Sequence, residues 1–293
     1  MIQIQNVNKK LDTKVVLQNL NWKIDAGKVH GLVGPNGSGK STILRLIAGI
    51  YEVDSGNVTI DAQPIFENPN IKNQIMFVSD DPFFLHQATL SEMMDFYQSF
   101  YQSFNKEIYD KLTKLFLLDT SVKINTFSKG MRRQASLILA FSTAPKYILL
   151  DEAFDGLDPV MRLALKRIIT DEILTNQMTV IISSHNIREL EDICDEIVLI
   201  QNGEINLSGD VETIHKAYHK YQMAFASNVD ESLFALFKPT ELEINSKFVT
   251  IVSKDDLYES LNKLNPLILE EIEMNLEEIF VYKMKEQGYG KDI

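Results

Sequence analysis

The chain has 293 residues with a formal net charge of −12, and 45% of its residues are hydrophobic while 24% are charged. This length is enough for one large and one small domain or for two medium domains, and the composition excludes wholesale disorder. The acidic balance argues against a nucleic-acid partner, and the single cysteine, Cys194, excludes an internal disulfide and a cysteine-rich zinc site.

The sequence gives no sign of a targeting or membrane-spanning segment. Its first residues open directly into strand-like sequence, without a basic segment or the hydrophobic core of a signal peptide. No apolar run approaches the roughly 18–20 residues that a bilayer span needs. We therefore expect a chain of the reducing cytoplasm, in which any membrane role comes through a partner.

Residues 1–7 and 15–24 alternate apolar and polar residues and predict two antiparallel strands, followed by a turn at 25–28. A short apolar run at 29–33 suits a buried strand. After the next helix, residues 58–61 and 73–78 are further strand candidates. For the chain up to about residue 215 we expect an α/β fold.

The segment Gly34–Ser41 reads GPNGSGKS and fits the phosphate-loop pattern of Gly, four residues, then Gly-Lys-Ser/Thr. It lies between the buried run at 29–33 and a predicted helix that starts near Lys40, so backbone N–H groups and the helix dipole would meet phosphate oxygens. Lys40 would reach the β- and γ-phosphates, and the Ser41 hydroxyl would bind Mg²⁺. The residues expected to bind nucleotide here are Gly34, Pro35, Asn36, Gly37, Ser38, Gly39, Lys40, Ser41 and Thr42.

Residues 89–118 show a helical pattern in which Phe96, Phe100 and Phe104 recur at every fourth position. A second helix is predicted over 106–117. The ordinary interpretation of this aromatic stripe, which we favour, is a helix–helix core. The alternative is that part of it forms a groove for a partner helix.

The second half of the chain brings acidic and polar residues to the ends of buried strands. Residues 147–150 are apolar and lead into Asp151 and Glu152, and residues 179–182 lead into Ser-Ser-His at 183–185. Open α/β sheets bind ligands at the carboxyl ends of such strands. Helices are predicted from Ser128 onward, over 160–174 and over 187–194, with a hairpin over 196–207.

From about residue 215 the pattern changes to strand-like segments at 221–226, 242–244, 248–252 and 267–272, with helix-like segments at 230–237, 255–264 and 276–286. We expect a small separate α+β domain over 216–293 with an accessory or regulatory role. It contains no Gly-rich loop, metal-ligand cluster or nucleophile arrangement.

Taken in order, six motifs over residues 1–216 resemble those of the ATP-binding subunit of an ABC transporter. The resemblance implies a P-loop NTPase fold with an antiparallel β-subdomain and a helical subdomain at about 82–140, within an ATP-binding domain of residues 1–215, plus the small C-terminal α+β domain. It also implies ATP and Mg²⁺ as ligands and an ATPase activity coupled to transport.

The resemblance assigns roles to individual residues. Asp151 matches the aspartate that holds Mg²⁺, and Glu152 matches the catalytic glutamate that polarises the attacking water. His185 matches the switch histidine that touches the γ-phosphate. Ser128 and Gly130, in Phe-Ser-Lys-Gly-Met at 127–131, match the signature that contacts ATP of the facing subunit, and Asp158 ends the loop that joins the two sites across the dimer.

The sequence departs from the family pattern at three places. Leu11 stands where an aromatic residue usually stacks on adenine, so stacking is weakened or supplied elsewhere. Asp80 stands at the position of the usual glutamine; it could still meet Mg²⁺, but it lacks the amide donor. Lys129 and Met131 replace glycine and glutamine within the signature.

The small C-terminal domain makes the chain similar to the ATPases of ABC-2-type exporters, which handle drugs, antimicrobial peptides and, in staphylococci, phenol-soluble modulins. This implies a multi-span permease as partner and a location on the inner face of the cell membrane. It also implies a second nucleotide-binding domain, either an identical or a different subunit.

Three other functions are weighed against this one. A P-loop kinase does not explain Ser128, Glu152 and His185 together. A non-transport ABC ATPase usually carries two nucleotide domains or long coiled coils, which the sequence lacks. A regulatory module that binds ATP without hydrolysing it gains some support from Leu11 and Asp80, but Glu152 argues against it.

Overall fold

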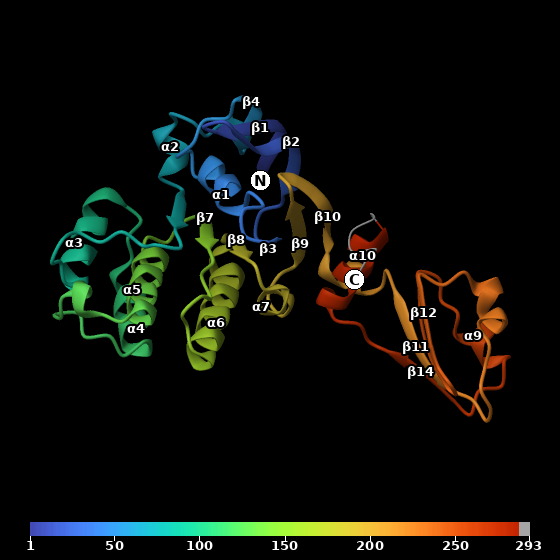
Figure 1. Cartoon of the computed structure of the whole chain (residues 1–293). Helices are drawn as coiled ribbons and strands as arrows, with labels where there is room; N and C mark the ends of the chain where they lie inside the picture. Colours follow the sequence, from blue (N-terminus) through green and yellow to red (C-terminus); the bar gives the residue numbers. More distant parts are fainter. Residues whose placement is uncertain (287–293) are drawn as a thin grey trace. The chain divides into compact units, whose positions relative to one another are not determined.

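The computed structural model describes residues 1–286 and divides the chain into two compact units, Met1–Ser208 and Gly209–Ile293 (Figure 1). All the expected site residues lie in the first unit, which contains an antiparallel and a mostly parallel sheet. The second unit is built on a sheet of its own. Residues 287–293 of the expected C-terminal domain lie outside the described part.

An antiparallel sheet with the order β2-β1-β4-β5 forms the N-terminal layer. Its strands are β1 (Ile2–Leu11), β2 (Lys14–Ile24), β4 (Ser55–Ile60) and β5 (Gln63–Pro64). The predicted alternation holds at the start of β1, where Ile2 and Ile4 are buried and Gln3 is half-buried; an irregularity in the pairing with β2 between Ile4 and Val7 then turns Val7 inward three residues after Ile4. The short helix α2 (Pro69–Lys72) follows this sheet.

The central sheet has the order β10-β9-β3-β8-β7-β6. Its strands are β3 (Val29–Val33), β6 (Ile75–Val78), β7 (Tyr147–Asp151), β8 (Thr179–Ser184), β9 (Glu196–Gln201) and β10 (Glu204–Asp210). Strand β3 pairs in parallel with β8 and β9, and β7 pairs in parallel with β6 and β8. The carboxyl ends of β3, β7 and β8 therefore meet at one edge, which is where parallel sheets place ligands.

Helix α1 (Lys40–Ile47) packs on both β4 and β7, so one apolar core joins the two sheets. Helices α6 (Pro159–Asn176) and α7 (Ile187–Glu191) belong to the same unit. The helix predicted over 187–194 is shorter than expected: α7 ends at Glu191, and Cys194 is buried in the turn that leads to β9. Within residues 1–286, no helix has the length and apolar character needed to cross a membrane.

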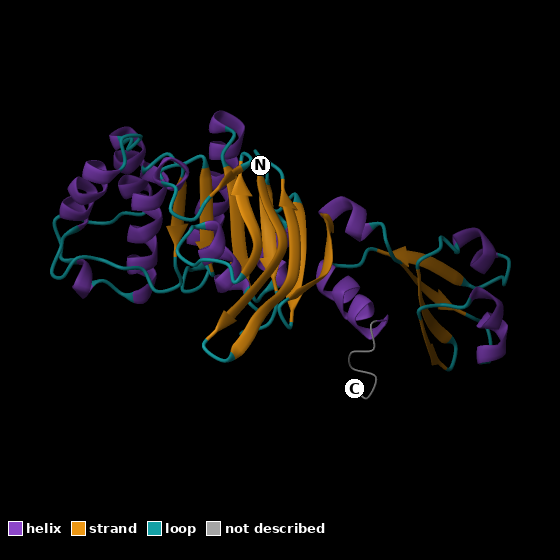
Figure 2. Cartoon of the chain, turned by 90° about the horizontal axis from the view of Figure 1, so that it is seen from above, coloured by secondary structure: helices purple, strands orange, loops and turns teal. Residues whose placement is uncertain are grey.

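Three helices and a short 3₁₀ turn gather beside β6, as Figures 1 and 2 show: α3 (Leu90–Phe100), α4 (Lys106–Leu115), α5 (Lys129–Ser142) and η1 (Ile124–Thr126). Thr89 and Glu92 form a capping box at the start of α3. The core interpretation of the aromatic stripe is wrong for Phe96 and Phe100, which are 37% and 64% exposed. They line an open groove instead.

The second unit is built on an antiparallel sheet with the order β12-β13-β11-β14. Its elements are α8 (Val211–His215), β11 (His219–Ala224), η2 (Glu231–Phe237), β12 (Glu241–Asn245), β13 (Phe248–Ser253), α9 (Tyr258–Asn262), β14 (Ile268–Ile272) and α10 (Leu276–Glu286). Tyr221, Phe234 and Ile251 form its core. The segment expected to be helical at 230–237 is a 3₁₀ helix, and α9 is shorter than the predicted 255–264. Helix α8 packs against α10, so the expected boundary at 215 falls inside this unit.

Candidate active site

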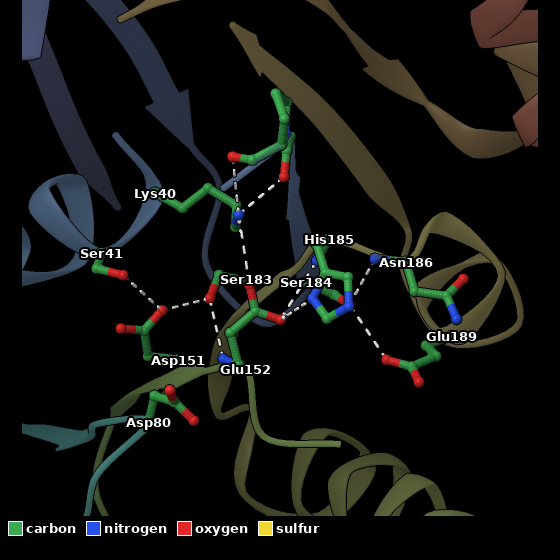
Figure 3. A network of polar contacts seen from close by, with 12 residues as sticks. Lys40, Ser41, Asp80, Asp151, Glu152, Ser183, Ser184, His185, Asn186 and Glu189 are labelled. Atoms are coloured by element: carbon green, nitrogen blue, oxygen red, sulfur yellow. Dashed lines mark hydrogen bonds and ion pairs between the residues drawn. The ribbon is translucent and has the colours of Figure 1, made fainter. Parts of the chain in front are cut away.

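The phosphate loop connects β3 to α1, and Lys40 is the first residue of that helix. The Lys40 side chain is 5% exposed and folds back over the loop, where its Nζ donates to the carbonyl oxygens of Gly34 (2.8 Å) and Pro35 (3.3 Å) (Figure 3). Gly39 precedes the helix with a φ of 114°, a conformation that side chains disfavour. The loop thus holds the ammonium group at the start of the helix, where anions are attracted.

Backbone contacts from β9 hold the loop in place. A Cβ added to Gly34 would collide with the carbonyl oxygen of Ile200, so only glycine allows this close approach. In the β9–β10 turn, the Gly203 N–H donates to the Ser38 carbonyl at 3.2 Å. Gly203 was not predicted as part of the site, since its Gln-Asn-Gly sequence indicates a hairpin turn and nothing about its neighbours.

Asp151 ends β7 and is 1% exposed. Its Oδ1 accepts hydrogen bonds from the Ser41 hydroxyl at 3.1 Å and from the Ser183 hydroxyl at 2.6 Å (Figure 3). The structure therefore brings together two of the three predicted metal ligands. Ser183 is an addition to the predicted set: the sequence showed a serine at the end of a buried strand, but only the pairing of β7 with β8 shows that it faces Asp151.

The oxygens of Ser41 and Asp151 suit a hard divalent cation. Mg²⁺ takes oxygen ligands at about 2.0–2.1 Å in an octahedron, so two neighbouring ligands lie about 3.0 Å apart. The separation between Ser41 Oγ and Asp151 Oδ1 is 3.1 Å. These two atoms could hold Mg²⁺ as neighbouring ligands without a large movement.

Glu152 directly follows β7 with a φ of 49°, which is uncommon for a residue with a side chain. Its N–H is bonded to Ser183 through both the carbonyl oxygen (3.2 Å) and the hydroxyl (3.1 Å). Glu152 Oε1 lies 3.3 Å from Lys40 Nζ, and its Oε2 lies 2.9 Å from His185 Nδ1. The carboxylate is thereby held between the phosphate loop and the end of β8 (Figure 3).

His185 is half-exposed and paired with Glu152. The hydrogen bond that the ring donates to that carboxylate, and then the negative charge of the carboxylate, raise the pKa of His185 above the ordinary value of 6.5. Two hydrogen bonds stabilise the turn around His185. The Ser184 hydroxyl donates to Glu189 at 3.1 Å, and Glu189 accepts from Arg162 of α6 at 2.6 Å. Neither Glu189 nor Arg162 was among the predicted site residues.

A cavity of about 700 Å³ is lined in part by Lys40, Ser41 and Glu152. Its lining residues are Leu11, Asp12, Thr13, Lys14, Val16, Asn36, Gly37, Gly39, Lys40, Ser41, Thr42, Asp80 and Glu152. This set contains most of the phosphate loop together with aliphatic Leu11 and Val16, and the described lining includes no aromatic ring. The expectation that adenine stacking is weakened or supplied elsewhere stays a prediction.

The predicted signature residues lie at a helix start, as expected. Ser128 is the N-cap of α5, and its hydroxyl accepts from the Met131 N–H at 3.2 Å. Neither Ser128 nor Gly130 belongs to the described residues that line the cavity. Asp158 caps α6 by accepting from the Met161 N–H at 2.9 Å.

Asp80 lies on the cavity rim, but one of its carboxylate oxygens is already engaged. Asp80 Oδ1 is 2.7 Å from Nη2 of Arg133, which is 2% exposed on α5. Arg133 was not among the predicted site residues, although it belongs to the helix predicted from Ser128 onward.

The comparisons with known proteins agree with this geometry. The sequence model of the ABC transporter family matches residues 17–155. The ABC transporter ATP-binding protein YtrB of Bacillus subtilis is 30% identical over 285 residues, which cover 97% of this chain and 98% of that protein. The chain belongs to the ABC transporter ATP-binding proteins.

Solved structures show the same fold for the first unit of this ABC protein. An ATP-binding subunit of an ABC transporter matches with a TM-score of 0.68 and 25% identity over 74% of this chain and 92% of the other. A dimeric ATP-binding cassette in a post-hydrolysis state with ADP and Pi matches with a TM-score of 0.64 and 22% identity, covering 72% and 99%. The P-loop NTPase fold class is confirmed.

The family assignment settles the activity at a coarse level. This ABC protein is an ATP-binding, ATP-hydrolysing subunit of a transporter. The prediction of an ATPase is therefore confirmed, while the roles of the individual side chains stay predictions that the geometry above makes specific.

Proposed function

We propose that this chain powers an ABC exporter through closure of two nucleotide-binding domains around ATP and Mg²⁺. The observation that carries the proposal is the separation between the cavity with Lys40 and the N-terminus of α5 with Ser128. Each chain would offer two separate half-sites: the cavity with Lys40, and the N-terminus of α5 with Ser128. A second nucleotide-binding domain would bring the missing half to each.

Within one such site, we propose a task for each side chain, and the contacts described above support it. Lys40 would exchange its two loop carbonyls for phosphate oxygens, and Ser41 with Asp151 would hold Mg²⁺, which neutralises phosphate charge when bound. Glu152, already oriented by its N–H bonds to Ser183, would accept the proton of the attacking water. His185 lies on the far side of that carboxylate and would donate to the γ-phosphate.

The residues that complete the site come from the facing subunit. Ser128 and the Gly130 N–H, at the positive end of α5, would contact the γ-phosphate held by the partner. Asp158 would connect the two sites across the interface.

The exposed groove beside β6 supports a permease as the membrane partner. It has a volume of about 430 Å³ and opens between β6, the loop after it and α3. Among its lining residues are Phe77, Pro82, Phe83, Phe96, Phe100 and Tyr101. An amphipathic helix of a multi-span permease would fill this groove, and the chain would then act on the inner face of the cell membrane.

We further propose a cargo of the drug, antimicrobial-peptide or amphipathic-peptide class, including phenol-soluble modulins. The lantibiotic transport ATP-binding protein SrtF of Streptococcus pyogenes supports this, with 29% identity over 72% of this chain and 92% of that protein. A sulfate/thiosulfate import ATP-binding protein of Neisseria meningitidis is 31% identical over 77% of this chain, so an efflux assay has to decide the direction. The unit after residue 208 would be an accessory or regulatory domain.

Light scattering of the Glu152→Gln variant tests the proposal. This change removes the base but keeps the side-chain volume, so a closed state would persist with ATP bound. We expect a monomer without nucleotide and a dimer with Mg-ATP. The double variant Lys40→Ala, Glu152→Gln is the matched control and should stay monomeric.

The two possible failures of this experiment point to different errors. A variant that binds ATP but never dimerises would contradict closure of two identical chains and require a different second nucleotide domain. A variant that does not bind ATP would contradict the assignment of Gly34–Ser41. Adding ADP in place of ATP should leave the monomer unchanged.

A further inference from the structure

Arg133 lies in the second turn of α5 and is 2% exposed, although it carries a charge. Its guanidinium grips the segment after β6 at three points: Nη1 donates to the Ser79 carbonyl at 2.8 Å, and Nη2 donates to the Asp80 carbonyl and to Asp80 Oδ1, both at 2.7 Å. Two donors on one planar group thus fix both the backbone and the side chain of the segment. A buried arginine without its carboxylate would be strongly unfavourable.

The Asp80 end of this contact reaches the nucleotide cavity. Asp80 is half-exposed and lines the same cavity as Lys40, Ser41 and Glu152. The ion pair therefore connects the rim of that cavity to the helix whose first turn carries Ser128.

The start of α5 also contacts the loop that follows Glu152. A Cβ placed on Gly130 would lie 2.8 Å from the Gly156 carbonyl oxygen, so the two backbones are already in contact. The start of α5 is thereby held between the Asp80 segment and the loop that contains Gly156. Both of these segments begin at the edge of the sheet where the nucleotide site lies.

We propose that Asp80 and Arg133 are positioning residues that hold the start of α5, and with it Ser128 and Gly130, at a fixed place relative to the nucleotide cavity. In this proposal the contact of Asp80 Oδ1 with Arg133 gives Asp80 a positioning role rather than a metal-binding one. The expected effect on the turnover rate rests on the proposed function, in which Ser128 meets ATP of the facing subunit. The expected effect on the structure of a single chain is independent of that proposed function.

Hydrogen–deuterium exchange on the single, nucleotide-free chain tests the structural part. Asp80→Ala leaves Arg133 buried without its carboxylate, and amide exchange at residues 79–82 and in the first turns of α5 should become about tenfold faster. Asp80→Asn keeps an oxygen that can accept from Arg133 and should restore most of the protection. Asp81→Ala removes a neighbouring exposed acid that is not paired with Arg133, and it should change nothing.

ATPase kinetics test the positioning role. Asp80→Ala should lower kcat about tenfold, because a displaced α5 start misplaces Ser128, while ATP binding to the monomer and the Mg²⁺ concentration for half-maximal rate stay unchanged. Arg133→Gln should show the same defect, and the double variant should be no worse than either single one. If Arg133→Gln does not fold, Arg133→Lys in the Asp80→Ala and Asp80→Asn backgrounds supplies the comparison.

Three results would overturn the proposal. Unchanged exchange at the start of α5 in Asp80→Ala would show that the ion pair does not hold the helix. A raised Mg²⁺ requirement with unchanged exchange would assign Asp80 to the metal instead. Kinetic defects that multiply in the double variant would mean that the two residues act separately. The exchange result stands even where Glu152→Gln fails to dimerise, so the two proposals fail in distinguishable ways.

Discussion

Among single residues, Glu152 is held by several neighbours at once. A positive φ is maintained because Ser183 satisfies its N–H twice, while its two oxygens are divided between Lys40 and His185. The carboxylate proposed as the base therefore reaches the cavity already oriented, and it has a cation on either side when His185 is protonated. Such preorganisation is worth more than the individual contacts, since no side chain must be ordered during the reaction.

The pKa of His185 should report this pairing. Glu152→Gln removes the carboxylate whose hydrogen bond and charge raise that pKa, so the value should fall toward the ordinary 6.5. Titration of the His185 ring by NMR in the nucleotide-free protein measures the shift. Asp192→Asn changes an exposed acid on the neighbouring turn and should leave the titration as it is; an unchanged value in Glu152→Gln would contradict the pairing.

The pairing of His185 with Glu152 also predicts how the free energy of unfolding changes with pH. Because the folded-state pKa of His185 is raised, the stabilisation from this pair is fully present below pH 6.5 and is lost as pH rises through the raised value. The difference in unfolding free energy between the wild type and Glu152→Gln should therefore shrink between mildly acidic and mildly alkaline pH. Denaturant titrations at several pH values check this, and a difference that grows with pH would contradict it.

Among the elements, α5 contacts two separate segments that lead away from the site. It is capped by Ser128, contacts the Gly156 backbone through Gly130 and holds the segment after β6 through Arg133. Because of these contacts, a movement of α5 should be coupled to the segment after β6 and to the loop that contains Gly156. Its position is the simplest structural link between the nucleotide cavity and the helices around α3.

Gly130→Ala should disturb this link. Alanine normally favours a helix by about 1 kcal/mol over glycine, but a Cβ at 2.8 Å from a backbone oxygen cannot be relieved by rotating a side chain. We expect a loss of about 1–3 kcal/mol in unfolding free energy and a lower kcat. Met131→Ala truncates an exposed side chain in the same turn and serves as the control for both measurements. Wild-type stability and rate in Gly130→Ala would contradict the close approach.

The groove between β6 and α3 should be required for binding the permease. Phe83 lines it with 74% of its surface exposed, and a carboxylate there would have to be desolvated under a bound helix. Phe83→Asp should reduce co-purification with the permease about tenfold and abolish transport while nucleotide binding stays intact. Leu174→Asp changes an equally exposed residue of α6 that is not part of the groove. Equal recovery of permease with both variants would contradict the proposed surface.

At the scale of the whole molecule, the chain combines two units with separate cores. The cavity residues all lie before residue 208, while Tyr221, Phe234 and Ile251 form the core of the second unit. Ligand bound by one unit should stabilise that unit alone, apart from any coupling between the two.

Calorimetry of the full chain tests this division. Mg-ATP at 100 times its Kd should stabilise the first unit by about 2.7 kcal/mol and move one of two transitions to higher temperature. Glu152→Gln prevents loss of ATP during the scan. A single transition that moves as a whole would instead mean that the two units unfold together, and Lys40→Ala, Glu152→Gln gives the baseline without bound nucleotide.

The sequence predicted those parts of the site that depend on consecutive residues. Gly34–Ser41, Asp151 with Glu152, and Ser128 at a helix start lie where expected, because a loop motif, a buried strand and an N-cap are local patterns. Ser183 and Gly203 escaped prediction since their roles arise from strand pairing, which brings together residues far apart in the chain.

The errors have a similar origin. Phe96 and Phe100 follow the period of a buried helix face, yet that face opens onto a groove, because periodicity shows which residues share a side and not what covers it. Arg133 was passed over for the opposite reason: an arginine early in a helix is commonly solvated, and only its burial reveals that it needs an anion.

The burial of Arg133 also constrains how this sequence can change over evolutionary time. A lineage that replaced Asp80 with an uncharged residue would leave a desolvated cation behind, and one that replaced Arg133 first would leave Asp80 and two backbone carbonyls without their donor. Either intermediate is disfavoured, so the two positions should change together among descendants of this chain. An alignment of its near relatives would then show aspartate and arginine gained or lost as a pair.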